Sequence, residues 1–297
     1  MYRRWRNDFY RPAAIVFIIP YRAGAMEKTL KALAGVMLLG ALLASVSCGS
    51  SGQSSLTSQS GPLSGNWQIS LQRHVLPNPA LVFSGFLVQS GNNVSGAVSL
   101  GSNCLGVGPV SGTVDSQNVT LTINEFGEDI SLQGTVATGS SPMGGEFSNL
   151  AGGCTAYANT GTWSAIQVAP IAGSFLGTFT SSAVVSNGTV QVSGTLNQGP
   201  NTGNTTATLT GNISSTSGNQ FCSYLSSATI SGLISGESVV LSLYGPNGAQ
   251  TAQFGNLGDN PAITVTPDGK SISGSYVFPP ISTSCTGDQG TFQLTFQ

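Results

Sequence analysis

From residue 65 to the C-terminus, apolar and polar residues alternate in short segments separated by turn sequences. Alternation with a period of two puts the apolar side chains on one face of a β-strand. Turn dipeptides such as Asp115-Ser116 and Phe126-Gly127 separate the segments. No window of helical length beyond residue 48 has a 3.6-residue period. Many short strands at this spacing predict an all-β protein, either a sandwich or a barrel.

The same landmarks occur twice in the same order, which predicts two tandem copies of one β-domain. Residues 111–123 align without gaps on residues 231–243. Each copy opens on glycine-x-aromatic and closes on glycine-threonine-aromatic. These landmarks are Gly65-Asn66-Trp67, Gly161-Thr162-Trp163, Gly173-Ser174-Phe175 and Gly290-Thr291-Phe292. We therefore predict β-domains at 65–168 and 172–297.

Eight strands are predicted in each copy. They span 67–71, 81–89, 94–100, 110–115, 119–123, 130–136, 144–147 and 162–166 in the first copy. In the second they span 173–180, 189–196, 205–213, 228–234, 238–244, 251–254, 271–278 and 291–296. Short strands joined mostly by tight turns favour an antiparallel up-and-down meander that closes into a barrel, with a two-sheet sandwich as the alternative.

Barrel closure removes exposed strand edges, which a chain with 7% charged residues has little means of protecting. The first and last strands of each copy then pair, so Trp67 is expected near Trp163, and Phe175 near Phe292. The opening and closing landmarks are similar to those of the eight-stranded barrels of the streptavidin and lipocalin type. That resemblance is architectural and implies no ligand residues.

Basic residues are concentrated before the predicted domains. Beyond residue 47 only Arg73 and Lys270 are basic, against nine acidic residues. Such a body cannot neutralise a row of phosphates, so nucleic-acid binding is excluded.

Residues 26–47 have the parts of a secretory signal peptide: a short basic stretch, an apolar run and a small-residue exit. The run, residues 32–46, is shorter than the about 20 residues of a transmembrane helix. The exit, Ser45-Val46-Ser47-Cys48, resembles the lipobox of a bacterial lipoprotein precursor, with Ser45 in place of the usual leucine. Ordinary signal cleavage, which also accepts small residues there, is the alternative.

The lipoprotein resemblance implies that diacylglycerol on the Cys48 sulfur and an acyl chain on its amino group anchor the exported protein to the cell envelope. Gly49, rather than aspartate, implies the outer membrane in a cell that has two membranes. Residues 48–64 are rich in Gly and Ser and are expected to form a flexible tether. Residues 1–25 fit either an early start codon or a long basic extension of the signal, so Met1 and Met26 both stay open as the start.

Four of the five cysteines pair by their positions in the repeat. This predicts disulfides Cys104–Cys154 and Cys222–Cys285, since exported chains oxidise. Cys48 is the odd thiol, which lipidation explains. No CxxC occurs, so no metal site is predicted.

Candidate catalytic residues are few. His74, the sole histidine, lies in a Pro-bounded loop and is expected to be exposed or packed in that loop. The acidic residues Glu125, Glu128 and Asp129 surround a turn, as solvated charges on a hairpin tip, a weak Ca²⁺ site or a glycosidase pair. Neither a Gly-x-Ser-x-Gly motif nor a cofactor motif is found, so no enzyme, catalytic residue or cofactor is predicted.

Trp67 and Trp163 are candidate ligand contacts, because tryptophan either fills a β-domain core or stacks on a sugar.

Three hypotheses for the function remain. The first is a non-enzymatic envelope lipoprotein whose β-domains bind a neutral ligand, a glycan or a protein partner. The second is a secreted hydrolase that uses the acidic cluster, and the third is an outer-membrane barrel built from all the strands.

Overall fold

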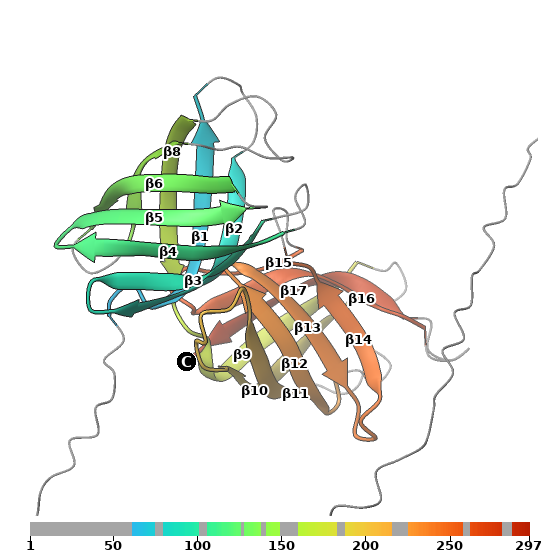
Figure 1. Cartoon of the computed structure of the whole chain (residues 1–297). Coiled ribbons are helices and arrows are strands. Elements are labelled where there is room, and N and C mark those ends of the chain that lie inside the picture. The colour runs from blue at the N-terminus through green and yellow to red at the C-terminus, as the bar shows by residue number, and fades with distance from the viewer. Residues whose placement is uncertain are drawn as a thin grey trace, which may run out of the picture. The chain divides into compact units, whose positions relative to one another are not determined.

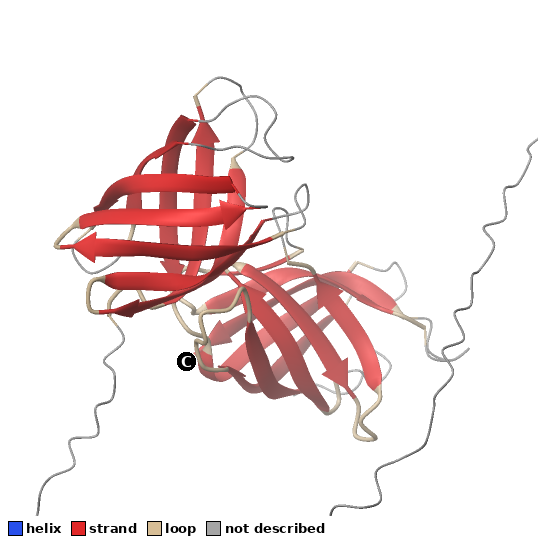
Figure 2. Ribbon diagram, in the orientation of Figure 1, coloured by secondary structure: helices blue, strands red, loops and turns tan. Residues whose placement is uncertain are grey.

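A computed structural model describes residues 61–74, 80–100, 106–125, 128–137, 141–148, 160–182, 188–215, 225–257, 262–280 and 287–297. In these ranges every regular element is a strand (Figure 2), so the all-β prediction is confirmed. None of them contains a helix long and apolar enough to cross a membrane. The predicted signal peptide, most of the tether and all five cysteines lie outside the described residues.

The first eight strands form one closed barrel (Figure 1). They are β1 (Gly65–Arg73), β2 (Leu81–Ser90), β3 (Asn93–Leu100), β4 (Val107–Asp115), β5 (Asn118–Glu125), β6 (Glu128–Val136), β7 (Met143–Ser148) and β8 (Thr160–Val168). Each strand pairs antiparallel with the next, and β8 closes the ring on β1 with Leu71 opposite Trp163. The predicted up-and-down barrel is confirmed, and the sandwich is not formed.

The remaining strands form a second ring. They are β9 (Ala172–Ser181), β10 (Thr189–Gln198), β11 (Ala207–Ser215), β12 (Ala228–Ser235), β13 (Ser238–Tyr244), β14 (Gln250–Gly255), β15 (Ile263–Val265), β16 (Ser271–Phe278) and β17 (Asp288–Phe296). Pairing of β17 with β9 and of β12 with β13 closes it. The strands thus form two barrels and not the single ring that the third hypothesis requires.

Both β14 and β15 pair with β13, and together they occupy the place that β6 alone holds in the first barrel. The sequence predicted β14 but not β15. Three residues are too few to show a period of two, so a strand this short leaves no alternation to detect.

The aligned segments 111–123 and 231–243 form equivalent hairpins. Asp115 pairs with Asn118, and Ser235 pairs with Ser238. The two-residue turns share a left-handed residue at the same place, Ser116 with φ 57° and Gly236 with φ 55°, as tight hairpin turns require. The register therefore agrees with the repeat that the sequence predicts.

Closely approaching backbones explain why the strands are rich in glycine. At one glycine in most strands, a Cβ would lie closer than 3.0 Å to a carbonyl oxygen of the adjacent strand, a distance that real Cβ atoms do not reach. These residues are Gly85, Gly96, Gly112, Gly134, Gly145, Gly161, Gly177, Gly194, Gly211, Gly232, Gly255, Gly274 and Gly290. Glycine kinks of this kind let a sheet curve enough to close.

Buried apolar side chains form two clusters, one for each barrel, so the barrels do not share one interior. Phe86 of β2 and Val168 of β8 are exceptions, because both belong to the cluster of the second barrel. Inside that barrel, Phe179 stacks on Phe292 with ring centroids 5.0 Å apart. Phe179 also meets the Tyr276 ring edge-on at 5.1 Å. Large aromatic side chains thus fill this part of the interior.

Residues 55–297 form one compact unit. Within it, the buried side chain of Asn66 exchanges two hydrogen bonds with the turn at Gly236. Its Nδ2 donates to the Gly236 carbonyl at 2.8 Å, and the Gly236 N–H donates to its Oδ1 at 2.7 Å. Gln68 Nε2 also donates to Glu237 Oε2 at 2.9 Å. These bonds satisfy polar groups of Asn66 that burial would otherwise leave unpaired.

We predict that Gly211→Ala destabilises the second barrel, because the new Cβ would collide with the Thr195 carbonyl oxygen. Forcing a methyl group into such a contact costs about 1–3 kcal/mol of unfolding free energy. Gly245→Ala is the matched control, since its nearest neighbours lie at 3.4 Å. Chemical denaturation of the two variants measures the difference, and equal stabilities would show that close approach does not select the strand glycines.

Candidate functional site

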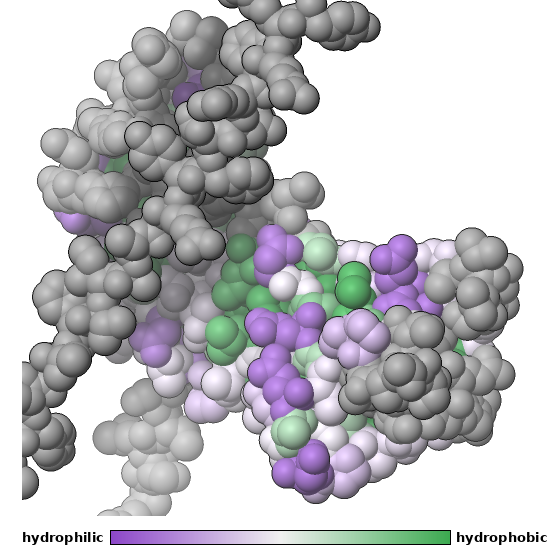
Figure 3. All heavy atoms as spheres, turned by 90° about the vertical axis from the view of Figure 1, so that its right-hand side faces the viewer, coloured by the Kyte–Doolittle hydropathy of each residue, from purple (hydrophilic) through white to green (hydrophobic). Residues whose placement is uncertain are grey.

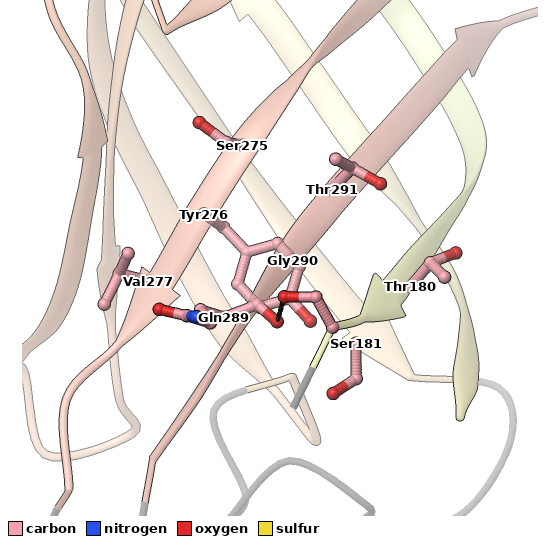
Figure 4. A pocket seen from close by; sticks show the side chains of 9 residues that line it. Thr180, Ser181, Ser275, Tyr276, Val277, Gln289, Gly290 and Thr291 are labelled. Atoms are coloured by element: carbon pink, nitrogen blue, oxygen red, sulfur yellow. Dashed lines mark hydrogen bonds between the residues drawn. The ribbon is translucent and has the colours of Figure 1, made fainter. Parts of the chain in front are cut away.

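A hollow of about 340 Å³ lies on the outer wall of the second barrel (Figure 4). At its centre, Gly290 of β17 pairs with Tyr276 of β16 on one side and Ser181 of β9 on the other. Six exposed side chains frame this glycine, and none of them is charged. Two come from β16, two from β17, one from β9 and one from the residue that follows β9. They are Thr180, Ser182, Ser275, Val277, Gln289 and Thr291.

The hollow depends on the glycine beneath it. A Cβ at Gly290 would collide with the Thr180 carbonyl oxygen, so β9 and β17 approach more closely here than a side chain allows. At the rim, the Ser182 N–H and Oγ both donate to the Gln289 carbonyl, at 2.8 and 3.0 Å. The close approach of β9 and β17 at Gly290 therefore shapes the base of the hollow, and the hydrogen bonds of Ser182 to Gln289 shape part of its edge.

Beneath the hollow, a buried carboxylate ties the three strands together. Asp288 accepts a hydrogen bond from Ser181 Oγ at 2.6 Å and another from the Tyr276 hydroxyl at 2.7 Å. All three residues are at most 8% exposed. Burial, and then the neighbouring Asp288, raises the pKa of Tyr276 well above its usual value. Tyr276 therefore stays neutral and keeps donating at physiological pH.

The first barrel has an equivalent position at Gly161. This glycine pairs with Phe147 on one side and Arg73 on the other, as Gly290 pairs with Tyr276 and Ser181. The His74 N–H donates to the Thr160 carbonyl at 3.3 Å, as the Ser182 N–H does to Gln289. The registers superimpose residue by residue, so both barrels carry this glycine-centred position.

The two positions differ in charge. In the first barrel, His74 Nε2 lies 3.6 Å from Glu146 Oε2, with the two side chains 53% and 68% exposed. Such an exposed contact contributes little stability. Counting along the paired strands, His74 corresponds to Ser182, Glu146 to Ser275 and Arg73 to Ser181. Charged or ionisable residues of the first barrel thus correspond to serines of the second.

Trp67 and Trp163 lie in the core of the first barrel, 0% and 3% exposed. Their indole N–H groups donate to the Leu63 and Gln133 carbonyls, at 2.8 and 3.1 Å. Both belong to the core cluster of the first barrel. A ligand would reach these rings only inside that barrel.

The register of β1 with β8 sets Trp163 opposite Leu71, four residues along β1 from Trp67, and in the second barrel Phe175 lies opposite Phe296 and not Phe292. The strands pair as predicted, but the aromatic residues are not directly opposite one another.

The acidic residues lie where β5 and β6 meet. The backbones of Glu125 and Glu128 pair at the end of the hairpin. The exposed Asp129 accepts a hydrogen bond from Asn124 Nδ2 at 2.7 Å. The cluster therefore occupies a hairpin tip, as the first of the three interpretations predicted. Among the described residues, no three His, Cys, Asp or Glu side chains are grouped as metal ligands.

Cys48 and the cysteines of the two predicted disulfides fall outside the described residues, so lipidation and both pairings stay predictions. Comparison of the chain with protein-family models, curated proteins and solved structures finds no match.

Sequence reasoning did not single out the hollow. Its signal was present in the repeated glycine-threonine-aromatic landmark, which contains both Gly161 and Gly290. The site becomes visible when the register brings Ser181, Tyr276 and Gly290 side by side.

We predict that Tyr276 makes the protein lose stability at alkaline pH. Above pH ~10 an unfolded tyrosine releases its proton, whereas folded Tyr276 keeps it because its pKa is raised. The unfolded state then binds fewer protons, so the free energy of unfolding falls as the pH rises. The expected contribution is about 1.4 kcal/mol per pH unit for this single group.

Denaturation of the full chain and of Tyr276→Phe between pH 8 and ~11.5 isolates this effect. The other tyrosines titrate in both proteins, so the difference between the two curves reports Tyr276 alone. We expect Tyr276→Phe to lower the free energy of unfolding by about 1–3 kcal/mol at pH ~8, because it removes a hydrogen-bond donor from Asp288. Above pH ~10 the difference between the two proteins should become smaller. Parallel curves would contradict the proposed role of Tyr276.

Proposed function

We propose that this protein is a non-enzymatic lipoprotein of the bacterial cell envelope that binds a neutral ligand on its second barrel. The hollow over Gly290 carries this proposal, because it is lined only by uncharged residues. Its volume of about 340 Å³ falls within the range of about 300–1,000 Å³ typical of small-molecule sites.

The chemistry of the hollow favours a ligand that forms hydrogen bonds and has no net charge. Thr180, Ser275 and Thr291 present hydroxyl groups, each of which both donates and accepts. A charged ligand would lose part of its hydration here without gaining an opposite charge from the lining, which is unfavourable. Figure 3 shows one face of the second barrel, on which purple hydrophilic residues and green hydrophobic residues lie next to one another among paler ones.

Export and anchoring rest on the sequence. The signal-like residues 26–47 end at Cys48, and a Gly/Ser-rich tether follows. Acylation at Cys48 would hold the barrels at the envelope, in the outer membrane of a cell that has one. The oxidising compartment would then pair Cys104 with Cys154 and Cys222 with Cys285.

We predict the state of every cysteine in the exported protein. Mass spectrometry of unreduced peptides should find a diacylglycerol thioether and an acylated amino group on Cys48, which becomes the N-terminal residue. It should also find the other four cysteines in two disulfides, one within each barrel. An unmodified Cys48 would contradict lipid anchoring, and a bridge between the barrels would contradict the pairing that the repeat predicts.

We also predict that the hollow discriminates against charge. Myo-inositol and N-acetylglycinamide are neutral probes, and inositol monophosphate and N-acetylglycine are their charged counterparts. Titrations followed by the backbone amide resonances of Thr180, Ser275 and Thr291 should show binding of at least one neutral probe. Its charged counterpart should bind at least about tenfold more weakly, because the lining does not compensate the charge. Equal binding of both, or shifts confined to other strands, would contradict the proposed site.

A further inference from the structure

We propose that the hollow over Gly290 binds one or two residues of a neutral saccharide, and that the equivalent position in the first barrel does not share this specificity. This inference rests on the proposed neutral-ligand site and names the chemical class that fits it. Three observations support the inference: the hydroxyl groups that line the hollow, the pairing of its strands and the comparison of the two barrels.

The lining matches the functional groups of a sugar ring. Hydroxyl side chains at Thr180, Ser275 and Thr291 lie in one row across β9, β17 and β16, directly opposite one another. Neighbouring strands are about 4.8 Å apart, so this row presents groups that both donate and accept at regular intervals. Sugar hydroxyls have the same dual character and need no charged partner.

An apolar contact lies beside this row. The Val277 side chain is 59% exposed at the hollow, although it is a large hydrophobic residue. A sugar ring has C–H groups on its faces as well as hydroxyls at its rim, so it would cover Val277 and reach the hydroxyl row together (Figure 4).

The pairing of the strands argues against a peptide ligand. Extended peptides bind sheets by adding a strand to a free edge. Here β17 is paired with β16 on one side and β9 on the other along the whole hollow. Its main-chain groups are already used, so recognition must come from side chains.

The first barrel provides an internal comparison. At its equivalent position, His74 and Glu146 replace Ser182 and Ser275. The two side chains meet at 3.6 Å on the outer wall, where they would occupy the row that a neutral sugar needs. Duplication has thus produced one neutral and one charged version of the same position.

The test uses the full chain in a detergent without a sugar headgroup, followed by backbone amide resonances. The probes are maltohexaose, cellohexaose and chitohexaose, with a capped uncharged peptide, N-acetyl-Gly-Ser-Gly amide, as the other arm. We expect at least one oligosaccharide to shift the amides of Thr180, Ser275 and Thr291. The peptide should not shift them.

Two exchanges of residues provide the matched variants. Ser182→His with Ser275→Glu gives the second barrel the side chains of the first, and should weaken saccharide binding at least about tenfold. His74→Ser with Glu146→Ser makes the reverse change in the first barrel and should leave the affinity of the Gly290 hollow unchanged. Val277→Ser, which removes only the apolar contact, should weaken binding severalfold and serves if the double variant does not fold.

The outcomes separate this inference from the proposed function. If the peptide shifts the hollow and no oligosaccharide does, the saccharide assignment is wrong but a neutral-ligand site stands. If neither these probes nor the small neutral ones shift it, both are wrong. Unchanged saccharide affinity in both second-barrel variants would place the binding elsewhere and overturn the inference.

Discussion

The close approach of neighbouring backbones at strand glycines is the constraint on which the rest of the structure depends. An eight-stranded ring leaves an interior just wide enough to be filled by side chains, so the strands must curve tightly. At positions such as Gly112 and Gly232, the adjacent carbonyl occupies the space of a Cβ. The requirement recurs around both rings, and it accounts for thirteen of the 40 glycines in the sequence. Closure in turn leaves few unpaired edges for a nearly uncharged chain to protect.

The same constraint produces the candidate site. Gly290 lets β9 approach β17, and the two strands join β16 over a buried carboxylate. Asp288 has two hydroxyl donors in Ser181 and Tyr276, so the strands beneath the hollow are fixed by hydrogen bonds as well as by pairing. A surface built on such a floor is rigid before a ligand arrives, which lowers the entropic cost of binding.

Much of the fold follows from the sequence, because strand alternation, tight turns and an ungapped repeat are local signals. All sixteen predicted strands are present, and the pairing of β1 with β8 follows from closure. The three-residue β15 left no alternation to detect. The candidate site was not predicted from the sequence for a different reason. Ser181, Tyr276 and Gly290 are distant in the chain, and only the register of the paired strands makes them neighbours. The closing glycine-threonine-aromatic landmark marks Gly290 in the sequence, but it does not tell which strands lie on either side of that glycine.

This chain has few charged residues. The position of each one is therefore more informative than it would be in a protein with an ordinary charged surface. Arg73 and Lys270 are the only basic residues after position 47, and His74 is the only histidine. Arg73 and His74 both fall at the first-barrel position that matches the hollow, and Glu146 joins them there. An exposed pair at this place stabilises the fold little, so folding does not explain the concentration. The proposed difference in what the two barrel walls bind would explain both the charges in one barrel and their absence from the hollow of the other.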